Sequence, residues 1–219
     1  MLDIRNLLRT ITVISLIMTM NYTSAQDTVK LPAPQKTGGL SLNEALSTRR
    51  SIREFDPTKQ LPEQTIADLL WAATGINRPD GHRTNPTALN AQEIDVYLIT
   101  KDGAYIYVPA SHSLTCVAEG DHRSLVAGTP TFSQDFVMDA PVSLVIVADT
   151  GKFSQQPDVA TLMGACDAGF ASQNINLFCA ANGLATVPRM TMDTNGLAKV
   201  LNLKPTQRPI LNNPVGYAR

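Results

Sequence analysis

The most restrictive feature of this sequence is the apolar run at residues 141–148, PVSLVIVA. The run has the length of a strand, and it is apolar at nearly every position instead of at every second one. This pattern predicts a central strand that is buried on both faces. The remaining elements must therefore cover a sheet from two sides.

Residues 158–182 form a long stretch without an internal proline, and Gly183 follows them. They predict a long buried helix that ends at Gly183. Its small side chains permit close backbone approach, either to the core or to another helix across a dimer interface. These small residues are Gly164, Ala165, Ala168, Gly169, Ala171 and Ser172.

The other patterns alternate without a regular βαβ order, which predicts an α+β fold: a sheet covered by helices. Ser41 to Glu44 is a capping-box pattern before a short helix at 45–49. Further helices are predicted at 63–74, closed by Gly75, and at 194–201. Strands are predicted at 94–100, 105–108, 184–187 and 210–217, and periodicity is weak over 109–139, where two short helices are expected.

The first 25 residues resemble a secretory signal peptide. Arg5 and Arg9 precede an apolar run at 11–20, and a small residue, Ala25, stands before Gln26. The run is shorter than the roughly 20 residues that a spanning helix needs. We expect export, to the periplasm, with either cleavage after Ala25 or a retained N-terminal anchor. The predicted organisation is a signal at 1–25, a surface tether at 26–39 with ordered structure from Leu40, and one domain at 40–219.

Composition excludes several classes of function. The chain carries 18 basic and 19 acidic residues, so nothing indicates a surface for nucleic acid or anionic lipid. Gly-x-Ser-x-Gly, Gly-x-Gly-x-x-Gly and Walker patterns are all missing from the sequence. The three histidines are scattered and predict no metal site. The three cysteines are expected to be buried thiols without a disulfide.

A basic segment at residues 49–53, Arg-Arg-Ser-Ile-Arg, is the candidate for binding chemistry. In an extended stretch, alternation places Arg49, Ser51 and Arg53 on one side. Guanidinium groups with a hydroxyl suit a phosphate. On spacing alone a solvated basic face is equally open, and a second loop, Pro86 to Gln92, reads as a turn with capping side chains.

Taken together, these segments resemble the nitroreductase family of FMN-dependent oxidoreductases. The resemblance rests on RRSIREF at 49–55, PTALNAQ at 86–92, QNINLFCAANGLATV at 173–187 and PVGY at 214–217, and it extends over 40–219. GAYIY at 103–107 with HSL at 112–114 is similar to the branch that contains azoline dehydrogenases of the SagB type. This second likeness concerns the substrate and not the cofactor.

The resemblance implies a mainly antiparallel sheet and a flavin site that begins at the basic segment. It assigns Arg49 and Ser51 to the FMN phosphate. It assigns Arg53 to the ribityl chain and the N1/O2 edge of the flavin, where a cation favours the reduced anionic form. Arg50 matches a position that contacts the flavin through its backbone or the phosphate.

The resemblance also implies a homodimer with two shared sites, because in the family a loop reaches the flavin from the partner subunit. The matching positions here are Pro86, Thr87, Ala88 and Asn90.

A third segment is expected over the N5/O4 side of the flavin, at Pro188, Arg189 and Met190. Many relatives continue past the PVGY stretch to a basic residue that binds the phosphate, a role for which Arg219 is the candidate in this chain.

The activity implied is hydride transfer from a reduced donor, NAD(P)H or another, through FMN N5 to a nitro, quinone or similar small acceptor. No catalytic acid or base is identified. Two alternatives stay open: dehydrogenation of an azoline-type ring in a small molecule or peptide, and a non-catalytic flavin-binding or interaction protein.

Overall fold

The computed structural model describes residues 28–219. The predicted signal peptide and its cleavage point lie outside the described residues. Among the residues described, no helix is both long enough and apolar enough to cross a membrane.

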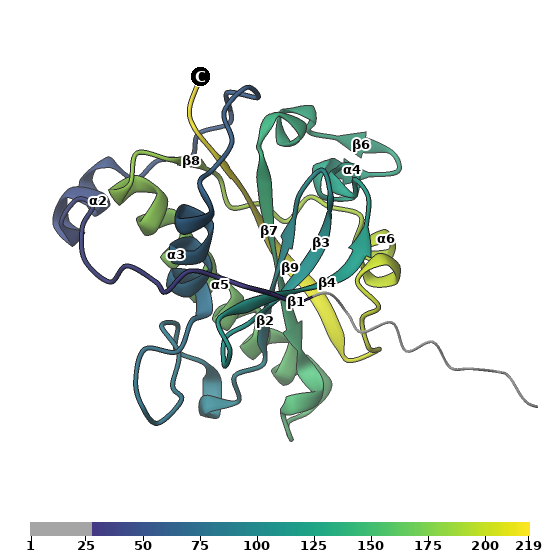
Figure 1. Cartoon of the computed structure of the whole chain (residues 1–219). Helices are drawn as coiled ribbons and strands as arrows, with labels where there is room; N and C mark the ends of the chain where they lie inside the picture. Colours follow the sequence, from purple (N-terminus) through teal and green to yellow (C-terminus); the bar gives the residue numbers. More distant parts are fainter. Residues whose placement is uncertain (1–27) are drawn as a thin grey trace, which may run out of the picture.

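The described chain is built on one seven-stranded sheet in the order β1-β4-β3-β2-β7-β9-β8 (Figure 1). Every strand pairing in it is antiparallel. The strands are β1 (Thr28–Lys30), β2 (Ile94–Ile99), β3 (Gly103–Val108), β4 (Ser113–Glu119), β7 (Val142–Asp149), β8 (Ala185–Thr186) and β9 (Gln207–Gly216). A separate hairpin joins β5 (Gly128–Thr129) and β6 (Phe132–Ser133). The predicted α+β fold with a mainly antiparallel sheet is confirmed.

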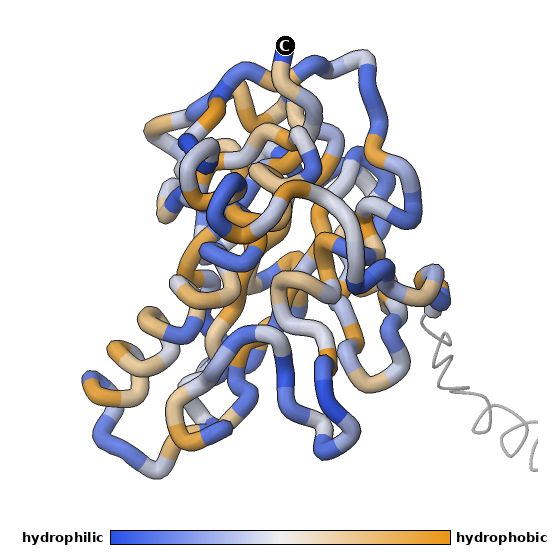
Figure 2. The backbone as a smooth tube through the Cα atoms, turned by 90° about the vertical axis from the view of Figure 1, so that its left-hand side faces the viewer, coloured by the Kyte–Doolittle hydropathy of each residue, from blue (hydrophilic) through white to orange (hydrophobic). Residues whose placement is uncertain are grey.

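Strand β7 lies in the interior of this sheet, between β2 and β9, and all of its eight residues are buried. Leu144 and Ile146 pack into a core beneath the helices α3 and α5, and Val145 and Val147 pack into a second core on the opposite face. The apolar run therefore reflects a sheet covered on both sides, as predicted. Figure 2 shows hydrophobic residues concentrated inside the fold and hydrophilic ones along the outer loops.

The helices divide between the two faces. Helices α2 (Leu42–Thr48), α3 (Glu63–Thr74) and α5 (Pro157–Ala181) lie on one side, and α4 (Arg123–Ala127) and α6 (Thr194–Val200) on the other (Figure 1). Three short 3-10 helices are also present among the described residues: η1 (Ala88–Asn90), η2 (Asp135–Asp139) and η3 (Thr150–Lys152).

The predicted helix ends are confirmed. Ser41 and Glu44 form both halves of a capping box at the start of α2. Gly75 caps α3. Gly183, at φ +67°, follows α5 in the left-handed conformation that glycine accepts without strain.

Two strands of the seven-stranded sheet were not predicted, nor was the hairpin of β5 and β6. The segment expected as a tether contributes β1, whose Val29 pairs with Leu114 of β4, and Leu31 is buried in the core. Ordered structure thus begins before Leu40. Strand β4 lies in the region of weak periodicity, where its mixture of small polar and apolar residues hides the alternation; the two short helices expected there correspond to α4 and η2.

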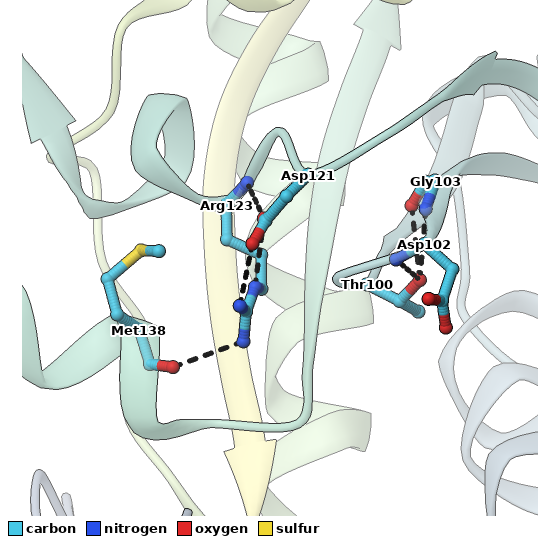
Figure 3. A network of polar contacts seen from close by, with 6 residues as sticks. All are labelled: Thr100, Asp102, Gly103, Asp121, Arg123 and Met138. Carbon is cyan, nitrogen blue, oxygen red and sulfur yellow. Dashed lines mark hydrogen bonds and ion pairs between the residues drawn. The ribbon is translucent and has the colours of Figure 1, made fainter.

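Polar contacts shape the turn before β3 and the segment after β4 (Figure 3). The Thr100 hydroxyl accepts the Asp102 and Gly103 amides, at 3.1 and 3.2 Å, and so shapes the turn between β2 and β3. Arg123 at the start of α4 makes a bidentate contact with Asp121 and also donates to the Met138 carbonyl at 3.1 Å. The second contact ties α4 to η2.

The cysteines are unpaired thiols. Cys179 is buried and Cys116 half-buried, whereas Cys166 is exposed on α5, contrary to the expectation that all of them are buried.

Candidate functional site

The basic segment leaves α2 as an extended strand-like stretch beside β8. The Ile52 amide donates to the Thr186 carbonyl at 3.0 Å, and Ile52 packs against the small core cluster of Phe55, Ala140 and Ala185. This anchoring turns the neighbouring residues outward: Arg49 is half-buried, and Arg50, Ser51 and Arg53 are exposed. The first and third predicted flavin segments are thus brought together.

The arginines of this segment have no anionic partner in the described chain. Of the salt bridges formed among residues 28–219, none involves Arg49, Arg50 or Arg53, and none of the side-chain hydrogen bonds there involves these residues or Ser51. Three unpaired guanidinium groups and a hydroxyl within five positions have the chemistry that a multiply charged anion requires.

Arg189 has a structural role that the sequence did not indicate. Its guanidinium points into the interior and donates to the Val126 and Ala127 carbonyls, each at 3.0 Å. It also donates to the Asn212 side chain and to the Gln134 side chain, each at 2.7 Å. The side chain therefore holds α4 and β9 together and does not face the outer surface.

The neighbours of Arg189 face outward. Pro188 is exposed, and Met190 is 75% exposed. Burial, and then the positive charge of Arg53, lower the pKa of Arg189 to about 10. The guanidinium of Arg53 thus lies within electrostatic reach of the segment at 188–190.

A buried amide network supports this part of the site from behind. The Ser172 hydroxyl donates to Asn213 at 2.8 Å, and Asn213 donates to Asn176 at 3.1 Å and to Thr186 at 3.3 Å. The network joins α5, β9 and β8 directly beneath the carbonyl that holds Ile52. The signal in the sequence was a pair of asparagines, Asn212 and Asn213, inside an otherwise apolar strand.

The predicted loop Pro86, Thr87, Ala88 and Asn90 contacts the middle of α5. The Ala88 amide donates to the Asp167 carboxylate at 2.7 Å. The start of the α2 region is instead tied to the end of α5, through the Leu40 amide and the Ala181 carbonyl at 3.0 Å. Fourteen helical residues separate these two anchors, about 21 Å at 1.5 Å per residue. Within one chain the loop thus contacts the middle of α5, whereas the basic segment follows α2, whose preceding residue Leu40 is held at the C-terminal end of α5.

Arg219 lies next to the basic segment but is already paired. Its amide donates to the Glu54 carbonyl at 3.1 Å, and its guanidinium contacts Asp139 at 3.3 Å. Because this ion pair is exposed, it contributes little stability and could exchange for another anion at small cost.

Two cavities lie on the α5 side of the fold. One of about 520 Å³ opens between residues 35–42, α3 and α5, with Trp71, Leu177 and Phe178 in its lining. Another of about 330 Å³ lies under the loop, lined by Arg83, Asn85 and Gln92 among others. The first has the size of a ligand cavity.

The sequence model of the Nitroreductase family matches residues 46–217. A curated protein of Methanocaldococcus jannaschii, named "Putative nitroreductase MJ1384", is 27% identical over 199 residues, which are 87% of this chain and 97% of that protein.

Solved structures agree with this match. A crystal structure from Ralstonia eutropha, described as that of a "putative nitroreductase", has a TM-score of 0.80 at 36% identity and covers 90% of this chain and 91% of its own. The fold is shared with a Staphylococcus epidermidis protein described as a "putative NAD(P)H:FMN oxidoreductase", at a TM-score of 0.62 and 14% identity over 85% of this chain and 91% of its own. The chain therefore belongs to the nitroreductase family, whose members are oxidoreductases.

Proposed function

We propose that this protein is an exported, homodimeric, FMN-dependent oxidoreductase. It would transfer hydride equivalents from a reduced donor, NAD(P)H or another, to a small acceptor such as a nitro compound or a quinone. The observation that carries the proposal is the set of unpaired arginines at 49–53 beside the segment 188–190. Membership of the nitroreductase family supports it.

The residues at this site fit FMN. A phosphate dianion matches Arg49, Arg50 and Ser51, which have no competing carboxylate in the described chain. Arg53, next along the segment, would set positive charge against the ring edge, where it favours the reduced anion. When bound, FMN would supply hydride transfer at N5. The protein's part is to bind and orient the two substrates in turn.

The separation between the basic segment and the loop supports a homodimer. A two-fold axis that crosses α5 near Gln173, between Asp167 and Ala181, would bring the loop of one chain towards the basic segment of the other. The same helix presents large apolar side chains to solvent, with Leu162 66% and Phe170 47% exposed. An exposed apolar stripe on a helix of this length is typical of a protein interface.

The first test is the absorbance spectrum of the purified protein, followed by anaerobic addition of NADH or NADPH. We expect flavin bands that bleach on addition of the nicotinamide. Flavin bands that persist would direct the search to another donor or to a dehydrogenase. A protein that takes up no flavin even after reconstitution with FMN would contradict the proposal.

The second test replaces the arginines one at a time. Arg49→Ala and Arg53→Ala should each weaken FMN binding by roughly 10- to 150-fold, because each loses charge-assisted hydrogen bonds worth about 1.5–3 kcal/mol. Arg208→Ala, which removes an exposed arginine at the start of β9, is the matched control and should bind FMN like the wild type. Full flavin retention in both site variants would rule out the basic segment as the phosphate site.

Export is tested separately by sequencing the N-terminus of the protein recovered from its native host. A mature chain that begins at Gln26 supports a cleaved signal, and one that begins at Met1 supports a retained anchor or no export.

A further inference from the structure

Glu93 is a buried acid whose carboxyl oxygens accept no hydrogen bond from another residue of the described chain. It precedes β2 and is 0% exposed. Its own backbone N–H approaches the carboxyl group and lowers its pKa, but less than burial raises it. A buried ionised carboxylate without donors is costly. Glu93 must therefore be neutral or hold a proton in common with a neighbour.

The neighbour is Asp167 of α5. Its carboxyl group lies within hydrogen-bonding reach of the Glu93 carboxyl and is 3% exposed. Two carboxyl groups in contact can form a hydrogen bond only if one of them carries a proton. One proton held between them would satisfy the oxygens that otherwise have no donor.

The other charges around the pair are cationic but are engaged elsewhere. Lys152 of η3 donates to the Gln92 carbonyl at 2.8 Å. Arg83, from the loop after α3, donates to the Ile94 carbonyl and to the Thr74 hydroxyl. Both act on Glu93 only through space, so no cation forms an ion pair with it that would replace the proton.

Asp167 is also the anchor of the loop. Its Oδ2 accepts the Ala88 amide at 2.7 Å. The next residues, Leu89 and Asn90, have φ of +56° and +51°, a conformation that disfavours non-glycine residues. A loop that is strained in this way needs an external contact to keep its shape, and the Asp167 carboxylate supplies one.

We propose that Glu93 and Asp167 share one buried proton, and that this proton positions the loop at residues 86–90 by keeping Asp167 in place to bind the Ala88 amide. Loss of the proton leaves two adjacent carboxylates, whose repulsion moves Asp167 and releases the loop. Glu93 is thus a positioning residue that acts through Asp167. The consequence for cofactor binding rests on the proposed function, in which this loop contacts FMN.

Burial and then the contact with Asp167 raise the pKa of Glu93 to about 7. The release is therefore expected near neutral pH.

The direct test uses the protein without added flavin, so that it does not depend on the proposed function. Hydrogen exchange of the peptide that contains Ala88 is followed by mass spectrometry from pH 6 to pH 8 and corrected for the intrinsic exchange rate. Protection in the wild type should fall by about tenfold over this range. In Glu93→Gln the new side-chain amide donates to Asp167 at every pH, so protection of the Ala88 peptide should not change with pH.

Two further variants separate this role from a general structural one. Asp167→Asn keeps an acceptor for Ala88 and adds a donor for Glu93, and it should also show protection that is independent of pH. Asp95→Asn, a change of another acid two positions along the chain, should keep the wild-type pH dependence. Equal pH profiles in the wild type, Glu93→Gln and Asp167→Asn would overturn the proposal.

The cofactor consequence is measured by FMN titration of the same proteins at the same pH values. FMN affinity of the wild type should fall between pH 6 and pH 8 by up to about tenfold more than that of Glu93→Gln. Titration of the FMN phosphate itself is common to both proteins and cancels in the comparison. If exchange shows the transition but no variant binds FMN, the proposed function fails and the proton switch stands.

Discussion

At the scale of single residues, the chain uses its arginines in two opposite ways. Arg50 and Arg53 are exposed, Arg49 is half-buried, and none of the three has an anionic partner in the described chain, which makes them available to a ligand. Arg189 is buried at 6% exposure and spends its donors on the interior. The two roles cannot be told apart from residue type, because a guanidinium is equally suited to an external phosphate and to internal carbonyls.

Replacing Arg189 should therefore affect stability first. Arg189→Met keeps the apolar stem but leaves the Val126 carbonyl and the Asn212 side-chain oxygen without the donor that the guanidinium supplies, at about 1–3 kcal/mol for each buried group. We expect the free energy of unfolding in urea to fall by at least about 2 kcal/mol. Met190→Ala changes the exposed neighbour and should alter it by less than about 0.5 kcal/mol. Similar midpoints for both variants would contradict the structural role.

Glu93 predicts a pH dependence of stability with a definite sign. Its pKa is raised to about 7 from 4.5, so between these values the folded state binds more protons than the unfolded state. Stability should decline as pH rises from about 4.5 to 7, by at most about 3 kcal/mol from this group. Urea unfolding across this range should show a larger decline in the wild type than in Glu93→Gln, because Asp95, whose pKa burial also raises, is present in both proteins.

At the scale of elements, local sequence predicted the helices better than the strands β1 and β4 on one side of the sheet. The helix at Glu63–Thr74 and the capping box at Ser41 follow from signals inside the segment itself. Strands β1 and β4 have no such signal, because each is specified mainly by its partner: Thr28 lies opposite Thr115, 87 positions away. Small and polar residues in β4 give a weak alternation that a neighbouring strand converts into a register.

The small residues of α5 were predicted to allow close approach, and Gly164 does so against the central strand. A methyl group added there would lie 2.8 Å from the Cβ of Ala148. In an open helix, Gly→Ala stabilises by about 1 kcal/mol. Here we expect the opposite sign, a melting temperature for Gly164→Ala several degrees below the wild type. A rise in melting temperature would show that the contact between α5 and β7 is not tight.

At the scale of the whole molecule, the three predicted flavin segments do not all meet within one chain. Ile52 of the segment at 49–53 donates to Thr186, which lies just before the segment at 188–190, and the loop is held at Asp167, near the middle of α5. Spacing in the sequence cannot reveal this, because it depends on where each segment packs in the folded chain. It is the reason that the site is proposed to need two chains.

Disrupting the α5 surface should therefore abolish FMN binding, although no residue of the proposed flavin site is changed. Phe170→Glu places like charges near the proposed two-fold axis and should yield a monomer that loses FMN. Light scattering coupled to size-exclusion chromatography, with the flavin spectrum of each peak, measures both. Phe132→Glu changes a comparably exposed phenylalanine on β6, across the sheet, and should stay dimeric with its flavin. A Phe170→Glu monomer that retains FMN would place the complete site within one chain.

The sequence by itself determined the fold class, the doubly covered central strand, the long helix and the basic segment. Each of these depends on interactions between residues close in the chain or on hydrophobic periodicity, which is written locally. Only the tertiary structure decided that Arg189 turns inward, that Glu93 meets Asp167 and that the loop is remote from the arginines. These depend on contacts between residues that are 23 to 79 positions apart. Their burial and charge environment is set by distant residues, which a local sequence pattern cannot predict.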